Sequence, residues 1–220
     1  DAHVRPRLII APHEPTAAHL APIRDWARVA GLTVATLTEA ESDAAAAQRD
    51  VIVVDRVGVL GDLYALANVA FVGGGFHAAG LHSVIEPAAF GAPVLFGPGH
   101  DMSREAGLLL AAGGARVVRD AGECSAAMGA WLSEPAARAV AGAAAASPLV
   151  QPAARAAAPT LASPMPRSRA RREVAGASAA GAGVSVMVSG CLMAKVLQQR
   201  AVLRGASVRM AMRRGRPHSR

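Results

Sequence analysis

The stretch from residue 69 to residue 98 holds the residues whose types and spacing best suit an anionic ligand. An apolar run, Val69 to Val72, has the length and composition of a buried strand, and the glycines at 73 to 75 follow it directly. Glycine accepts positive φ and lets another group approach the backbone closely. Ser83 and Glu86 have the spacing of a capping box, which predicts that a helix begins there. A glycine loop ahead of a helix N-terminus offers free N–H groups to a phosphate.

The side chains around this loop allow two interpretations. Glu86, one turn into the expected helix, could accept hydrogen bonds from sugar hydroxyls, or it could only close its own capping box. His82 could contact a ligand or only pack at the start of the helix. Glycine turns also occur in α/β domains that bind no phosphate, so the loop alone is a weak signal.

A second candidate loop follows the first expected strand, Arg7 to Ala11. His13 lies on it between two prolines, Pro12 and Pro15, that stiffen the chain. In an open α/β sheet, ligands bind at the carboxyl ends of strands, where this loop would lie. His13 is therefore a ligand candidate, and the alternative is an ordinary surface histidine.

Apolar runs and helical periodicity alternate along the first two thirds of the chain. This alternation predicts a Rossmann-like α/β fold with a parallel sheet and helices on both faces. The expected strands are 7–11, 33–37, 51–54, 69–72, 93–98 and 115–118. The expected helices are 17–30, 58–68, one from Ser83 to about Gly91, one from Asp101 or Ser103 to Ala112, 123–132 and 135–146.

Charge divides the chain into two parts. The net charge is +7 over 220 residues, but residues 1–150 hold 10 arginines and 15 acidic residues, whereas residues 151–220 hold 13 basic residues and one acidic residue. The basic part has no Phe, Trp or Tyr to stack on bases, which argues against nucleic acid as a partner. Two distant cysteines, Cys124 and Cys191, have neither disulfide-framework nor metal-site spacing.

These patterns predict a ligand-binding domain over residues 1–146 and a low-complexity tail over 147–220. The tail is rich in Ala, Arg, Ser, Pro and Gly, so we expect it to be disordered. Residues 174–194 are uncharged, which leaves a transmembrane helix as an alternative, although small residues make it a poor one. The loss of acidic residues is also typical of an out-of-frame reading of GC-rich DNA.

The motif residues together resemble a known family. The glycines at 73–75, the run Gly80-Leu81-His82-Ser83, and Glu86-Pro87 followed by Pro93-Val-Leu-Phe-Gly-Pro98 are similar to the C-terminal half of bacterial 3-deoxy-D-manno-octulosonic acid (Kdo) transferases. Residues 51–68 and 8–15 resemble two further segments of that family in the same order. The resemblance covers roughly residues 1 to 145.

The resemblance implies a function and a site. It implies the donor-binding C-terminal domain of a GT-B glycosyltransferase that moves Kdo from CMP-Kdo to a lipid A precursor in lipopolysaccharide biosynthesis. It implies no cofactor, no metal and no covalent enzyme intermediate, and it places the enzyme at the membrane surface, on the cytoplasmic face of the bacterial inner membrane. The implied donor-binding residues are His13, Gly73, Gly74, Gly75, His82, Ser83 and Glu86.

Some features depart from the family pattern or leave alternatives open. Ala11-Pro12 stands where the family often has Pro-Arg, and Leu81 and Ser83 replace a Gly and an Asn, so cationic and amide contacts to the donor are in doubt. The family's general base lies in its N-terminal half, which we expect to be missing, so no catalytic residue is assigned and the chain alone is expected to be inactive. The alternatives are a non-catalytic nucleotide-binding remnant and a UDP-sugar transferase or epimerase-like domain.

Overall fold

The computed structural model describes residues 6–77, 80–147 and 185–189. Strands and helices alternate as the periodicity predicted, and β1 and β4 have the expected bounds. The strands are β1 (Arg7–Ala11), β2 (Val34–Thr36), β3 (Val51–Val53), β4 (Val69–Val72), β5 (Val94–Phe96), β6 (Ala115–Val117) and β7 (Ser185–Ser189). The helices are α1 (Ala17–Val29), α2 (Leu37–Ser42), α3 (Leu60–Leu63), α4 (Ile85–Ala89), α5 (Arg104–Ala112), α6 (Ala121–Ser133) and α7 (Pro135–Ala145), with 3-10 turns η1 (Ala46–Gln48) and η2 (Tyr64–Leu66).

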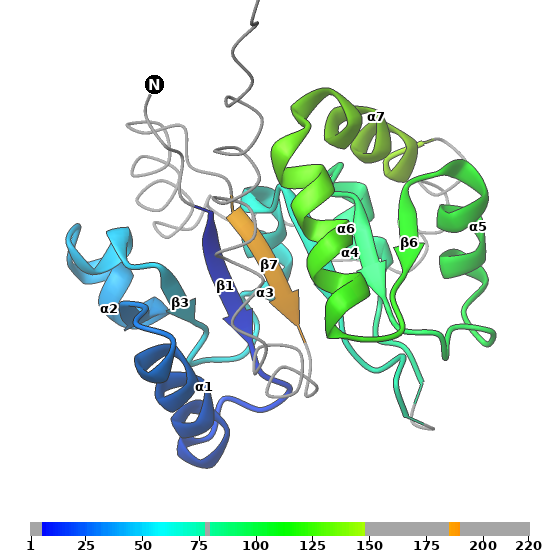
Figure 1. Cartoon of the computed structure of the whole chain (residues 1–220). Coiled ribbons are helices and arrows are strands. Elements are labelled where there is room, and N and C mark those ends of the chain that lie inside the picture. Colours follow the sequence, from blue (N-terminus) through cyan, green and yellow to red (C-terminus); the bar gives the residue numbers. More distant parts are fainter. Residues whose placement is uncertain (1–5, 78–79, 148–184, 190–220) are drawn as a thin grey trace, which may run out of the picture.

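All strands join one parallel sheet in the order β2-β3-β1-β7-β4-β5-β6 (Figure 1). From β1 the chain moves to β2 at one edge of the sheet and returns to β3, which lies between β2 and β1; it then crosses to β4 and builds outward the other way through β5 and β6. The connections that leave β1 and β4 therefore run in opposite directions, which is the kind of switch point where open α/β sheets bind ligands. The Rossmann-like fold predicted from the sequence is confirmed.

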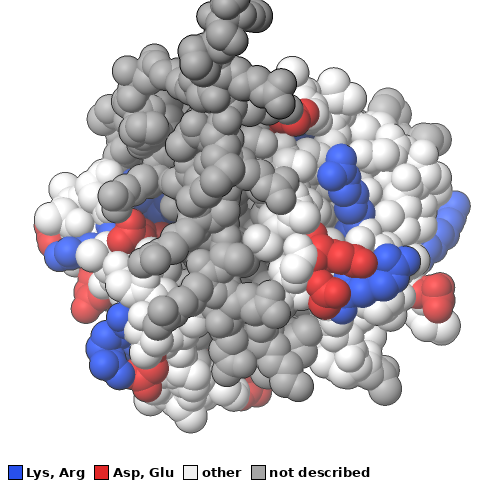
Figure 2. All heavy atoms as spheres, viewed as in Figure 1, with Lys and Arg blue, Asp and Glu red and all other residues white. Residues whose placement is uncertain are grey.

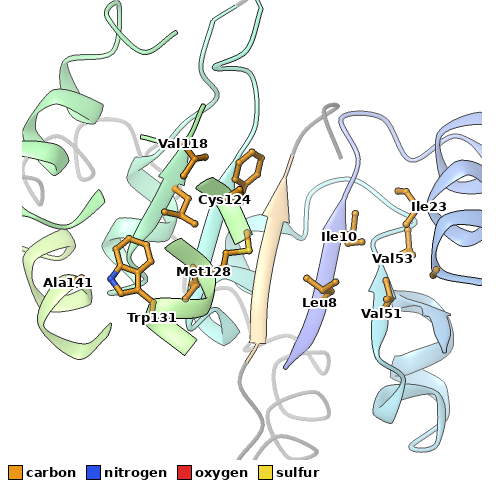
Figure 3. Packing of buried hydrophobic residues seen from close by; sticks show 14 residues of the cluster. Leu8, Ile10, Ile23, Val51, Val53, Val118, Cys124, Met128, Trp131 and Ala141 are labelled. Atoms are coloured by element: carbon orange, nitrogen blue, oxygen red, sulfur yellow. The ribbon is translucent and has the colours of Figure 1, made fainter. Parts of the chain in front are cut away.

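Alternating residues of each strand pack on opposite faces of the sheet. Leu8 and Ile10 of β1 lie in a cluster with residues of α1 and α6, whereas Ile9 and Ala11 lie in a second cluster with residues of α2 and α3. Figure 3 shows the first of these clusters, which extends from the side chains beside α1 across the central strands to those of α6. Burial on both faces explains why these strands read as continuous apolar runs in the sequence.

Helix α6 anchors one end of this core. Trp131, 1% exposed, is among the largest fully buried side chains, and Arg116 of β6 covers its ring with the guanidinium carbon 4.7 Å from the centroid. Cys124 lies in the same cluster (Figure 3), and burial raises the pKa of its thiol to about 12. The Cys124 thiol is therefore neutral at physiological pH and unreactive, and its role is packing.

Strand β7 differs from the expectation for the tail. Its residues, 185–189, belong to the segment expected to be disordered, yet they pair in parallel with β1 on one side and β4 on the other. The rest of 148–220 lies outside the described residues. The sequence offered only a short apolar run within a Gly- and Ala-rich segment, because pairing between strands so far apart in the chain leaves no local signal.

On the face drawn in Figure 2, neither sign of charge dominates the described residues. In Figure 2, arginine and carboxylate side chains lie beside one another over α1, α2 and α6. None of the described helices combines the length and the apolar character that crossing a bilayer requires. Of the segment 174–194, considered above as a possible membrane helix, residues 185–189 form β7 and the others lie outside the described ranges.

Candidate functional site

The glycine loop after β4 folds back on itself. The carbonyl oxygen of Gly73 accepts a hydrogen bond from the His82 backbone N–H at 3.1 Å, so the loop closes at its base. Gly74 has φ +96, and a Cβ built there would lie 2.2 Å from the Gly80 carbonyl oxygen. Position 74 therefore needs glycine both for its backbone conformation and for the close approach of the returning chain.

Gly75 has a structural role that its sequence position did not reveal. Its carbonyl oxygen accepts a hydrogen bond of 2.7 Å from the Gly99 N–H, and a Cβ at position 75 would lie 2.9 Å from backbone atoms of Gly97. The loops after β4 and β5 thus meet through their backbones. At least part of the glycine requirement is packing between two loops, and the glycines alone do not indicate a phosphate.

Two predicted site residues from different strands come together. The rings of His13, on the loop after β1, and His82, on the loop after β4, stack with their centroids 5.4 Å apart and an interplanar angle of 24°. His13 is exposed and His82 is half-buried. Burial is the largest cause that lowers the pKa of His82, and the positive charges of His13 and His77 lower it further. His77, on the same glycine loop, is a member of this histidine group that sequence reasoning missed.

The capping box predicted at Ser83 and Glu86 does not form. Helix α4 begins at Ile85 with Val84 as its N-cap, and no side chain caps it. The reason is Pro87: with Ser83 as the cap, Pro87 would be the fourth helical residue, whose N–H must donate to the cap carbonyl. Moving the start by one residue places Pro87 at the third position, where no intrahelical N–H is required.

Ser83 and Glu86 are nevertheless exposed, and they follow His82 closely in the chain. Glu86 lies in the first turn of α4, and within the described residues its carboxylate has no hydrogen bond or ion pair. Glu86 therefore does not close a capping box, which was the alternative to its binding a ligand. Within the described residues, neither Ser83 nor Glu86 contacts His13 through a hydrogen bond or an ion pair, so their place in a common site depends on their position at the same edge of the sheet.

The loop after β3 is tied to the body of the domain. Asp55 accepts a hydrogen bond from the Thr38 N–H at 3.2 Å, and Arg56 forms an ion pair with Glu41 of α2. The hydrogen bond to Glu41 is the first cause that raises the pKa of Arg56. These side chains hold the end of β3 against α2.

The described residues around these loops form no metal site, and a hollow in the surface lies elsewhere. In residues 6–77, 80–147 and 185–189, no three His, Cys, Asp or Glu side chains could hold a metal ion together. An open hollow of about 410 Å³ lies along α1 and β2, lined by Arg24, Arg28 and Glu39 with apolar neighbours. It contains none of the predicted site residues.

The lowered pKa of His82 makes stability depend on pH. The folded state holds fewer protons on this ring than the unfolded chain, whose histidine titrates near 6.5. The contribution is therefore fully present above about pH 6.5 and is lost as the pH falls through the folded pKa. We expect urea unfolding to show a steeper loss of stability between pH 7.5 and 5 in the wild type than in His82→Gln. Equal slopes would contradict a depressed pKa.

The fold and the two facing loops define a class. The chain is a doubly wound, Rossmann-like α/β domain whose candidate ligand residues lie at the switch point of the sheet. The particular proteins that the chain resembles are Kdo transferases. It is 49% identical over 49 residues to the 3-deoxy-D-manno-octulosonic acid transferase of Aquifex aeolicus, and 38% identical over 84 residues to that of Chlamydia muridarum. These matches confirm the predicted resemblance to that family.

The matched segments are short. They cover 22% and 36% of this chain and 14% and 19% of those two relatives, so the chain spans less than a fifth of the length of each. A bifunctional glycosyltransferase/methyltransferase of Fusobacterium nucleatum is 32% identical over 90 residues, which is 41% of this chain and 14% of that protein. No family model matches the chain.

Among solved structures, the chain is similar to the C-terminal CMP-Kdo binding domain of WaaA from Acinetobacter baumannii. The sequence identity is 19% and the TM-score is 0.49. The match covers 64% of this chain and 88% of that domain.

Proposed function

We propose that this chain carries the donor-binding part of a glycosyltransferase that uses CMP-Kdo. In the intact enzyme, Kdo passes to a lipid A precursor in lipopolysaccharide biosynthesis, at the membrane surface on the cytoplasmic face of the bacterial inner membrane. The glycine loop 73–75 and the turn into α4 hold the phosphate in this proposal. Glu86 accepts hydrogen bonds from the ribose hydroxyls, and His13 and His82 lie against the donor.

The observation that carries this proposal is the contact between His13 and His82. Two imidazoles from separate loops meet at the switch point, beside the glycine loop. A phosphate bound there would favour the protonated imidazoles and accept hydrogen bonds from them. The curated relatives, which are Kdo transferases, support CMP-Kdo as the donor over other nucleotide sugars.

Calorimetric titration of the full chain with CMP and with UDP tests the nucleotide. We expect CMP to bind more tightly than UDP, and Glu86→Ala to weaken CMP at least about fivefold, because a hydrogen bond to a charged group is worth about 1.5–3 kcal/mol. Glu134→Ala is the matched control, because Glu134 is also exposed. Glu134 follows the last residue of the 13-residue helix α6, so it lies about 20 Å from the loop where that helix begins. Preference for UDP would favour a UDP-sugar enzyme, and no binding would favour a non-catalytic remnant.

Donor binding and sugar transfer are expected to separate. By the family resemblance, the general base lies in the half of those enzymes that precedes the donor domain. We therefore expect this chain, incubated with CMP-Kdo and lipid A precursor, to release no CMP above the uncatalysed rate. Release of CMP with formation of a Kdo-bearing lipid, followed by mass spectrometry, would contradict this expectation.

A further inference from the structure

The place of β7 in the sheet has a consequence for the candidate site. β7 is the last of the described strands in sequence, but in the sheet it lies between β1 and β4 (Figure 1). These two strands do not pair directly with each other. The strands β2-β3-β1 carry the His13 loop, whereas β4-β5-β6 carry the glycine loop with His82. The hydrogen bonds of β7 therefore hold the two halves of the site at their separation.

The register brings the carboxyl end of β7 to the site itself. Ser189 pairs with Ala11 on one side and with Val72 on the other, and these are the last residues of β1 and β4. His13 follows Ala11 by two residues, and Gly73 follows Val72 directly. Ser189 thus stands at the same sheet edge, between the starts of the two loops.

The histidine contact must span the end of this strand. Neighbouring strands lie about 4.8 Å apart, so β1 and β4, with β7 between them, are separated by roughly 10 Å. The rings of His13 and His82 nevertheless approach to 5.4 Å between centroids. The two loops therefore lean toward each other over the position where β7 ends.

We infer that Ser189, at the carboxyl end of the tail strand, forms the floor of the donor site, beneath the phosphate that binds between the histidine loop and the glycine loop. This inference rests on the proposed nucleotide function and adds a residue of the tail to the site. Ser185, at the opposite end of the strand, pairs with Arg7 and lies about 13 Å away by the rise of a strand. The two serines are a matched pair for testing it.

Amide chemical shifts of the full chain during a CMP titration test the inference directly. We expect the Ser189 and Gly73 amides to shift with the same dissociation constant and the Ser185 amide to shift several-fold less. A Ser189 amide that stays still while the glycine loop shifts overturns the inference and leaves the proposed function intact. If no amide shifts, CMP binding itself has failed and both fall.

A charge at either end of β7 provides the second test. Two like charges a few ångströms apart repel by several kcal/mol at an effective dielectric constant near 20. Ser189→Asp should therefore weaken CMP binding at least about tenfold. Ser185→Asp should leave the affinity within about twofold, because its distance exceeds the Debye length of about 8–10 Å. Thermal unfolding of both variants confirms that they fold, and equal CMP affinities in the two would overturn the inference.

Discussion

Met187→Pro should lower the free energy of unfolding by at least about 2 kcal/mol and abolish CMP binding. Met187 is the middle residue of β7, paired with Ile9 of β1 and Ala70 of β4. Proline has no N–H and leaves one carbonyl of the central ladder without its donor, and an unsatisfied buried group costs about 1–3 kcal/mol before the steric clash of the ring is added. Because β7 is the described strand that pairs with both halves of the sheet, the damage should reach both ligand loops.

The matched control is Met187→Leu, which keeps the backbone N–H and a similar side-chain volume. Urea unfolding and CMP titration of the two variants separate the backbone effect from any effect of the side chain. If the proline variant were as stable as the leucine variant, β7 would not be part of the sheet in solution. That result would also remove the basis for placing Ser189 at the site.

Gly74→Ala should cost roughly 2–5 kcal/mol of stability, because two penalties add. An alanine at φ +96 is strained by about 1–2 kcal/mol, and its Cβ would lie 2.2 Å from the Gly80 carbonyl oxygen, so the loop must move at an overpacking cost of about 1–3 kcal/mol. The same movement would displace the His82 backbone, whose N–H closes the loop onto Gly73. We therefore expect weaker CMP binding as well.

Gly31→Ala is the matched control for this substitution. Gly31 has φ +71 but nothing within 4 Å of its added Cβ, so it should show only the conformational penalty of about 1–2 kcal/mol. The difference between the two variants in urea unfolding measures the close approach of the loop to itself. Equal losses of stability would mean that the loop relaxes freely and that position 74 does not constrain the site.

The Ser/Thr-x-x-Glu patterns at residues 36–39 and 83–86 show how far local sequence rules extend. Thr36 and Glu39 form a complete capping box at α2, with hydrogen bonds of 3.1 and 2.7 Å. Ser83 and Glu86 have the same spacing and do not, because Pro87 cannot donate from the position that this cap would give it. The capping box predicted at position 83 was wrong, because Pro87, directly after the pattern, decided where the helix begins.

Local sequence signals were sufficient to predict several parts of this protein. Short apolar runs located β1 and β4, the alternation of strands and helices determined the fold class, and the ordered motifs identified the resemblance to Kdo transferases. These features depend on residues close together in the chain, where composition and spacing are informative.

Contacts between residues that are distant in the chain have no such local signal. The stacking of His13 on His82, the packing of Gly75 against Gly97 and the insertion of β7 between β1 and β4 join segments separated by many residues. Such contacts are selected by the packing of the whole sheet, since every strand of this composition could pair with several others. The candidate site is therefore made of residues whose types the sequence predicts and whose neighbours only the fold supplies.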